Sequence, residues 1–392
     1  MKYRLEELVD LQIGRTPPRK EFEWFNTNGE GYKWVSIKDM GNSGRFISDT
    51  SEYLTEAAQK RFGIPIVERG TLLLSFKLTV GRLCITTDRM LTNEAIAQLP
   101  IKDTNIVDRD FLYYYLKNYN FHQLGSTSSI ATAINSTYLK KMEIDLPPID
   151  QQRAIAAVLS SIDDKIESNN AINNNLMQQA LCIYGSLIDG KSKNGCIGDY
   201  CSLKSGFAFK SEWWQDSGVP VIKIGSINQD CLNLKDCSYV SKDKIPLAKD
   251  FTVSGGDLLI AMTGATIGKF TMVPKTTETI LVNQRVGKFF LGDNPISRIP
   301  FIYSTLKQQE IISEISNRGQ GSAQPNISAT DIMSIPCVIP PQTEISAFNE
   351  QTTPIFEMII GNQYENTLLS NTRDSLLPKL LSGELDISAV EF

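Results

Sequence analysis

The sequence predicts an α+β protein with two tandem copies of one domain, each followed by a long helix, and the two helices pairing as a coiled coil about a pseudo-twofold axis. Two observations predict this fold. The segment LPPIDQQRAIAAVLSSIDDKIESNN (146–170) returns 193 residues later as IPPQTEISAFNEQTTPIFEMIIGNQ (339–363). Its prolines, apolar steps and an asparagine recur in place, and a Pro-Pro pair opens each helix. A repeat period of about 190 residues is too long for a solenoid, so it indicates duplicated domains.

The rest of the chain keeps the same order in both copies. ERGTLLLSFKLTVGR (68–82) resembles SGGDLLIAMTGATIGK (254–269), a buried strand opened by glycine and followed by a glycine-bearing loop. FLYYYLKN (111–118) echoes FIYSTLKQ (301–308). We therefore expect four regions: a first mixed domain (1–146), a central helical spacer (147–190), a second mixed domain (191–338) and a C-terminal helical spacer with a tail (339–392).

Both helices carry apolar residues in alternating steps of four and three, which is the heptad pattern of a coiled-coil seam. A buried seam asparagine lowers stability but fixes the register of pairing. The residues that we expect along the seam are Ile155, Leu159, Ile162, Ile166, Asn169, Asn173 and Leu176 in the first helix and Ile355, Ile359, Asn362, Asn366, Leu369 and Leu376 in the second.

The direction of pairing follows from the positions of the asparagines only in part. An antiparallel coiled coil about the helix midpoints would set Asn169 opposite Asn366 and Asn173 opposite Asn362. This is the arrangement that we expect, although parallel pairing would match the same residues. Two separate amphipathic helices, each packed on its own domain, are the alternative.

Proline bears on where the second helix begins. A proline inside a helix removes a hydrogen bond and clashes with the preceding turn. We therefore expect the long helix to begin with Thr353 as N-cap and Pro354 at the first helical position. Ser160 with Asp163 would cap the first helix at almost the same point. Each helix would then have about 25 to 35 residues and a length on the order of 40 to 50 Å.

The net charge of −5 hides an uneven distribution along the chain. Residues 1–145 carry 19 basic and 18 acidic groups, and residues 191–339 carry 16 and 13. The helical stretches are acidic, with 2 basic and 5 acidic groups in 146–190 and 2 and 8 in 340–392. The two domains are therefore mildly basic, which permits a nucleic-acid partner in spite of the acidic whole chain.

The seven cysteines are scattered and form no CxxC pair, and His122 is the one histidine. A structural zinc site is therefore not expected, and free thiols in a reducing cytosol fit better. The N-terminus MKYRLEELVD has no apolar core of a signal peptide, and no run approaches the ~18 apolar residues of a membrane span. We expect a soluble cytoplasmic protein with no membrane partner.

The sequence lacks the marks of an enzyme. A Ser-His-Asp triad would have to use His122, and one histidine excludes HExxH. GATIGK (264–269) is one residue short of a phosphate loop and has Phe270 where Ser or Thr would bind magnesium. The GxGxxG fingerprint, the Asn-Pro-Pro-aromatic motif of adenine methyltransferases and the common nuclease signature are also missing. These absences favour a reader or an adaptor.

The duplicated layout with its Pro-Pro helices resembles the specificity subunit of type I restriction-modification enzymes. PPIDQQRAIAAVLSSIDDKI (147–166) fits the family's Pro-Pro-x-x-Gln-like helix start, and GQGSAQPNIS (319–328) matches the Gly-Ser-x-Gln-x-Asn-like segment that ends each target-recognition domain. GSTSSIATAIN (125–135) keeps only part of that segment, and PPQTEIS (340–346) lacks the glutamine. The resemblance covers essentially the whole chain.

The resemblance implies a DNA-reading subunit without catalysis of its own. Each domain would read half of a split target in double-stranded DNA, and the paired helices would set the spacing between the halves. The helices would also bind two modification subunits, which bring S-adenosylmethionine and adenine methylation. Restriction subunits would add translocation and cleavage with ATP and Mg, so no cofactor is expected in this chain.

Two loops of each copy carry the candidate DNA-binding residues, because amides, guanidinium groups and hydroxyls read base edges and hold phosphates. For each of them, a polar surface loop without a ligand is the alternative. The candidates are Lys77, Thr79, Arg82, Ser126, Thr127 and Ser128 in the first copy and Thr263, Thr266, Lys269, Arg318, Gln320, Ser322 and Gln324 in the second. A second hypothesis is a duplicated scaffold that joins two protein partners and never contacts DNA.

Overall fold

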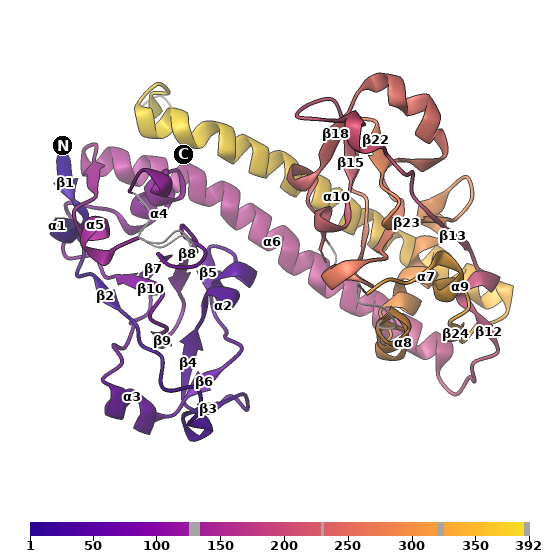
Figure 1. Ribbon diagram of the computed structural model, residues 1–392, viewed down its shortest axis with the longest axis horizontal. Coiled ribbons are helices and arrows are strands. Elements are labelled where there is room, and N and C mark those ends of the chain that lie inside the picture. Colours follow the sequence, from indigo (N-terminus) through magenta and orange to yellow (C-terminus); the bar gives the residue numbers. More distant parts are fainter. Residues whose placement is uncertain (125–133, 229–230, 320–324, 388–392) are drawn as a thin grey trace. The chain divides into compact units, whose positions relative to one another are not determined.

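The computed structural model describes residues 1–124, 134–228, 231–319 and 325–387 of the chain (Figure 1). The chain divides into two compact units. One consists of Met1–Glu167 with Leu369–Phe392, and the other is Ser168–Leu368. Each unit therefore combines one mixed domain with a stretch of each long helix.

Among its described residues, the N-terminal domain contains three sheets, with strand orders β1-β11, β2-β10-β7-β8-β5 and β3-β6-β4-β9. The strand β7 lies at the centre of the largest sheet and is buried along its whole length. The strands are β1 (Lys2–Arg4), β2 (Gln12–Ile13), β3 (Phe25–Asn26), β4 (Tyr32–Val35), β5 (Phe46–Ile47), β6 (Tyr53–Leu54), β7 (Leu72–Ser75), β8 (Leu83–Thr86), β9 (Met90–Thr92), β10 (Ile96–Leu99) and β11 (Glu143–Asp145). The helices are α1 (Leu5–Leu8), α2 (Ile37–Asn42), α3 (Glu56–Phe62), α4 (Arg109–Lys117) and α5 (Ser136–Lys140), with 3-10 turns η1 (Phe22–Trp24) and η2 (Phe121–Leu124).

The second domain builds its sheets in the orders β12-β24, β13-β23-β20-β21 and β14-β18-β15-β22-β19, with a small hairpin β16-β17. Its strands are β12 (Gly195–Cys196), β13 (Ser202–Ser205), β14 (Trp214–Gln215), β15 (Val219–Ile222), β16 (Ile227–Asn228), β17 (Cys231–Leu232), β18 (Ser238–Val240), β19 (Thr252–Val253), β20 (Leu258–Ala261), β21 (Phe270–Met272), β22 (Ile280–Val282), β23 (Val286–Phe290) and β24 (Pro336–Cys337). Its α-helices are α7 (Ile299–Leu306), α8 (Gln309–Gly319) and α9 (Ala329–Met333). Its 3-10 helices include η4 (Ser211–Trp213), η7 (Lys242–Phe251) and η8 (Gly264–Thr266).

The two domains share most of their strand order, whereas, of the described strands, β5 of the first copy and β16, β17 and β19 of the second have no counterpart in it. The order β2-β10-β7-β8 in the first copy corresponds to β13-β23-β20-β21 in the second, and β3-β6-β4-β9 corresponds to β14-β18-β15-β22. The parallel pair within each of the latter two sheets also recurs, since β4 runs parallel to β9 and β15 runs parallel to β22. The duplication predicted from the sequence is therefore confirmed at the level of strand order and direction.

Two long helices follow the domains, α6 (Ile149–Ile188) with 40 residues and α10 (Gln342–Ser382) with 41. Each begins directly after a Pro-Pro pair, because proline restricts the residue before it to extended conformations. In each unit one stretch of α6 packs against one stretch of α10 (Figure 1).

The predicted helix starts near Ser160 and at Pro354 are wrong. Both helices begin about eleven residues earlier, and α10 continues through the proline. Phe348 before Pro354 and Phe356 after it are both buried in the same core. Packing on both sides of the proline therefore outweighs the lost helical hydrogen bond, which costs about 3 kcal/mol. The Thr353 hydroxyl does not cap the helix but donates to the Asn349 carbonyl within it, at 2.7 Å.

Gln152, the second glutamine after the first Pro-Pro pair, connects α6 to its domain. Gln152 is 1% exposed. Its amide nitrogen donates to the carbonyls of Ile106 and Pro147 at 3.0 and 2.8 Å, and its oxygen accepts from the Asp108 backbone at 3.0 Å. In the second copy the corresponding residue is Ile345, which is buried in an apolar core instead. Gln152, which follows the glutamine of the Pro-Pro-x-x-Gln pattern, is thus a structural residue that fixes the start of the helix.

Free thiols are found at four buried positions, Cys84, Cys201, Cys237 and Cys337. Burial raises the pKa of the Cys84, Cys201 and Cys337 thiols to about 12, so these groups stay protonated at neutral pH. Of the helices in the described part of the chain, not one has both the length and the apolar character that crossing a bilayer requires.

Candidate nucleic-acid interface

The loop after the central strand of each copy has the same backbone hydrogen bonds. In the first copy Gly81 donates to the Ser75 carbonyl at 2.9 Å, and in the second Gly268 donates to the Ala261 carbonyl at 2.9 Å. The glycines adopt φ values of 91° and 79°, which residues with a side chain rarely adopt. The two loops are therefore equivalent structures built from different sequences, KLTV and TGATI.

A second segment meets each loop at the end of the strand. Ile134 donates to the Phe76 carbonyl at 2.9 Å, and Ile327 donates to the Met262 carbonyl at 3.0 Å. In the second copy Thr263 also forms an antiparallel bridge with Asn326. The structure thus brings each loop together with the described end of the second segment, at Ile134 in the first copy and at Asn326 and Ile327 in the second.

The predicted residues of the first loop differ in what they contact. Lys77 is half-buried, with its ammonium group 5.2 Å from the centre of the Phe76 ring, whereas Thr79 is exposed. The Arg82 guanidinium donates to the Ile37 carbonyl at 2.6 Å, beside the start of α2. Arg82 therefore serves the fold, and Lys77 and Thr79 are better placed to meet a ligand.

The second copy has a similar division. The hydroxyl oxygens of Thr263 and Thr266 are buried and have no hydrogen-bond partner among the described residues, and Lys269 is half-buried. Arg318 pairs with Glu314 at 2.9 Å and donates to the Asp331 carbonyl at 2.8 Å, so it stabilises the junction of α8 and α9. The remaining predicted residues, Ser126, Thr127, Ser128, Gln320, Ser322 and Gln324, lie outside the described residues.

The seam of the two helices is the second predicted site. Asn169 donates to the Asn366 side chain at 2.9 Å, and Asn362 donates to the Asn173 side chain at 2.8 Å. A step of four residues forward along α6 corresponds to four residues backward along α10, so the pairing is antiparallel. Asn169 also donates to Glu365 at 2.7 Å, which leaves its amide well satisfied although the residue is 1% exposed.

Apolar packing extends along the seam in both units, while the four asparagines lie in the unit Ser168–Leu368. In the N-terminal unit the predicted seam residues Ile155 and Leu159 are buried in a core that also holds Leu377 and Leu380. In the other unit Ile359 is buried and Leu176 and Ile355 are partly buried in one core. The last predicted seam residues, Ile162, Ile166, Leu369 and Leu376, are all half-buried.

Comparison with known proteins identifies the family. The profile described as "Type I restriction modification DNA specificity domain" matches residues 1–178 and again residues 190–365. The chain belongs to this family. Two matches along one chain are what the repeated topology of the two domains leads one to expect.

Relatives in the type I specificity family align over nearly the whole chain. The MjaIX specificity subunit of Methanocaldococcus jannaschii is 26% identical and covers 98% of this chain and 93% of its own length. The MjaVIII specificity subunit of the same organism is 22% identical, with 93% and 91% covered. The crystal structure of the type I S subunit from M. genitalium has the same fold, with a TM-score of 0.54 at 17% identity over 97% of this chain and 95% of that one.

Sequence reasoning missed a cluster of aromatic rings beneath basic side chains in each domain of this specificity subunit. In the first domain the Arg19 guanidinium lies 4.6 Å from the Phe25 ring centre and 4.7 Å from that of Trp34. In the second the Lys223 ammonium lies 3.7 Å from the Trp214 ring centre. Burial, with nearby Arg285 as a smaller cause, holds the pKa of Lys223 below its ordinary value. The adjacent basic and aromatic letters RKEFEWF and FKSEWW were the available signal.

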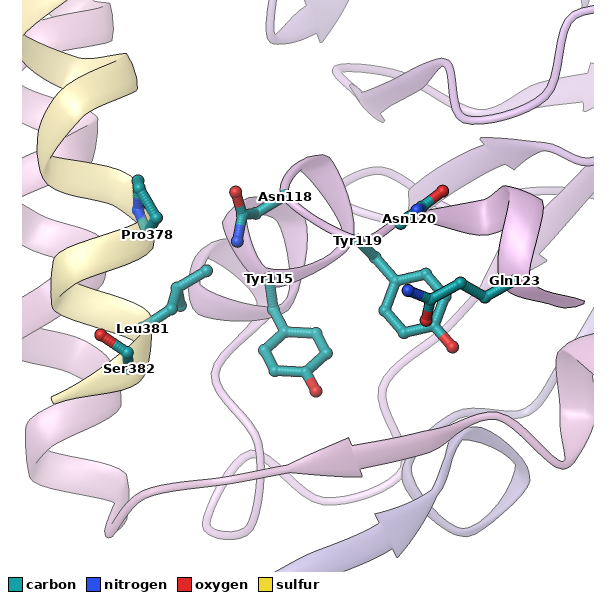
Figure 2. Close-up of a pocket in the computed structure, with 8 residues that line it drawn as sticks. All are labelled: Tyr115, Asn118, Tyr119, Asn120, Gln123, Pro378, Leu381 and Ser382. Carbon is teal, nitrogen blue, oxygen red and sulfur yellow. The ribbon is translucent and has the colours of Figure 1, made fainter.

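A shallow pocket of about 380 Å³ opens in the N-terminal unit between α4 and the end of α10 (Figure 2). Tyr115 and Asn118 line it from the side of α4, and Pro378 and Leu381 line it from α10 (Figure 2). Its lining contains none of the loop residues discussed above. The pocket therefore belongs to the junction of domain and helix, and not to the candidate DNA-binding loops.

Proposed function

We propose that this specificity subunit reads a split target in double-stranded DNA, with each domain contacting one half. The observation that carries the proposal is the duplicated topology with different loop sequences at the same strand end of each copy. A shared scaffold with different loops is suited to reading two different sequences.

The charge distribution supports a polyanionic ligand for the domains. Residues 1–145 have 19 basic and 18 acidic groups, a balance of +1, and residues 191–339 have 16 and 13, a balance of +3. The acidic helical stretches would contact protein partners and not DNA. Phosphate contacts supply much of the affinity for DNA, and they need basic groups on the domain surface.

The paired helices would set the spacing between the half-sites. A helix of 40 residues is about 60 Å long, which corresponds to roughly 18 base pairs at 3.4 Å per pair. The asparagine hydrogen bonds fix the register of α6 against α10. This length exceeds the sequence-based expectation because both helices begin earlier than predicted.

The chemistry would reside in partner subunits in the cytoplasm. Two modification subunits would dock on the helices and bring S-adenosylmethionine for adenine methylation. Restriction subunits would add cleavage with ATP and Mg. This division of roles rests on the membership of the family and on the absence of catalytic motifs in the sequence.

The test is DNA binding by the chain assembled with its modification subunits, measured at several salt concentrations. We expect the affinity for a duplex with the split target to fall at least tenfold between roughly 50 and 200 mM salt. Insertion of one base pair between the half-sites is expected to weaken binding, because the spacing is fixed. If the assembled complex binds no duplex, or binds it without salt dependence, the alternative of a protein scaffold without DNA contact is supported instead.

A further inference from the structure

Leu78 occupies a strained position in the loop after β7. Its φ angle is 65°, in the left-handed region, and its side chain is 67% exposed. A residue with a side chain is unfavourable in this region because its Cβ approaches the following carbonyl oxygen. An exposed leucine also gains little from the burial of apolar surface. Neither the backbone nor the core of the domain explains why leucine stands here.

The second copy gives the matched comparison. Gly264 is the equivalent residue. When the sequence of β7 is aligned with that of β20, the residues that form hydrogen bonds on both sides of the loop align as well, and Leu78 falls at Gly264. Its φ angle is 73°, close to that of Leu78. The fold therefore requires the left-handed conformation at this point in both copies. Glycine meets the requirement without strain, whereas the first copy keeps a leucine.

The neighbours of Leu78 fit a nucleic-acid ligand. Thr79 is exposed, and the Lys77 ammonium group extends over the Phe76 ring beside it. A cation and a hydroxyl hold phosphates, and an apolar side chain contacts a thymine methyl group or the face of an unstacked base. The loop thus presents one apolar group for a base between two polar groups for the backbone.

We propose that Leu78 contacts the bases of the DNA half-site that the N-terminal domain reads, and that it is one determinant of specificity for that half. This inference rests on the proposed function. The leucine is retained at a strained position because its side chain packs against the ligand and not against the protein. Strained residues that the surrounding structure holds in place gather at such sites.

The test replaces Leu78 with the residue of the other copy. Leu78→Gly is made in the full-length chain, which is assembled with its modification subunits, and binding to a duplex with the split target is measured. We expect affinity to fall about tenfold, the usual effect of losing one base contact. Discrimination among duplexes with single-base changes in the first half-site should also weaken, while discrimination in the second half-site should not change.

Thermal unfolding of the subunit separates this role from a structural one. Leu78→Gly relieves strain, so Tm should stay the same or rise by about 2 °C while binding falls. The reverse substitution, Gly264→Leu, places a leucine in the left-handed conformation and should lower Tm. The size of this decrease measures the cost of the strain. Leu247, an exposed leucine of η7, is the matched control, and Leu247→Ala should leave affinity within about twofold.

Three results would overturn the inference. Unchanged affinity and discrimination in Leu78→Gly would exclude a base contact, and a fall in Tm together with affinity would make Leu78 a structural residue. Loss of assembly with the modification subunits would make it a protein contact. Failure of the unaltered complex to bind duplex at all is a different result, because it contradicts the proposed function itself.

Discussion

Arg373 of α10 donates a hydrogen bond to Asp163 of α6 at 2.5 Å, and the two side chains are only 14% and 7% exposed. Tyr114 of α4 donates to the other carboxylate oxygen at 2.7 Å. Burial disfavours the charged guanidinium, but hydrogen bonds to Asp163 and Asp374 outweigh it and raise the pKa of Arg373 above its ordinary value. Domain, α6 and α10 are therefore joined through one carboxylate.

In the second copy, uncharged residues occupy the positions equivalent to Asp163 and Arg373. The residues 193 positions away are Phe356 for Asp163 and Ala180 for Arg373, and both are fully buried. Phe356 packs against the Tyr303 ring, with ring centres 5.4 Å apart. These two positions of the seam are thus equivalent, but they are charged in one unit and apolar in the other.

Removal of one member of the ion pair should destabilise the protein. Asp163→Ala or Arg373→Ala leaves its partner buried with fewer polar contacts, so each should lower the free energy of unfolding by about 3 kcal/mol. The double substitution should cost less than the sum, by about 1 kcal/mol or more, because the two groups interact directly. Chemical unfolding of the full chain measures all three variants.

An exposed ion pair is the control for this comparison of single and double substitutions. Arg153 and Asp150 lie 3.8 Å apart at the surface of α6. Their replacement by alanine should change the free energy of unfolding by at most about 0.5 kcal/mol. Additive effects of Asp163→Ala and Arg373→Ala would show that the buried contact contributes no coupling.

The asparagines of the seam should fix register at a cost in stability. Asn169→Leu alone leaves the amide of Asn366 with one partner fewer, so we expect a loss of about 1 to 2 kcal/mol. The pair Asn169→Leu with Asn366→Leu should recover this loss or exceed the original stability, but with a less uniform assembly state. Thermal unfolding and analytical ultracentrifugation measure the two effects. A uniform assembly state in the double variant would contradict a register role.

The continuous helix through Pro354 has its own test. Pro354→Ala restores a hydrogen bond to the carbonyl one turn earlier and should stabilise the protein by on the order of 1 to 3 kcal/mol, reduced by the gain in freedom of the unfolded chain. Thr353→Ala is the control and should have a small effect, because its hydroxyl bonds within the helix. If Thr353→Ala costs more and Pro354→Ala is neutral, the helix begins at the proline.

Lys269 in the loop and Arg318 in α8 of the second domain should differ in their effects: substitution of Lys269 should affect DNA binding, and substitution of Arg318 should affect stability. Lys269→Ala should weaken binding of the assembled complex and reduce its dependence on salt by about one phosphate contact, without loss of stability. Arg318→Ala should instead lower Tm, because it loses the bonds to Asp331 and Glu314. Lys249→Ala, at an exposed position of η7, is the control for charge alone. Equal effects of Lys269→Ala and Lys249→Ala would remove the loop from the interface.

The duplication, the Pro-Pro boundaries and the heptad seam were predictable because each is a periodic or local pattern. A duplication is recognised when similar segments recur in the same order along the chain. The conformational effect of a proline is local, because it restricts the residue directly before it. The helix starts were not predictable from Pro354 alone. Buried contacts of Phe348 and Phe356 across the proline decide them, and a local rule contains no such contacts.

The structure gives contacts of the predicted site residues that the sequence did not reveal. The sequence proposed two loops in each copy, and it did not reveal that Arg82 and Arg318 both donate to backbone carbonyls of the protein. Leu78 was passed over because nothing in the letters KLTV reveals a positive φ angle. The equivalence with Gly264 becomes informative only when both backbone angles are known.

The most direct test of the central claim is a map of methylated adenines in cells with and without this gene. We predict a split motif, with two specified halves separated by a spacer of fixed length, that is methylated only when the gene is present. Replacement of the loop at residues 77–80 should change one half of that motif and leave the other intact. An unchanged methylation map on deletion of the gene would contradict the account.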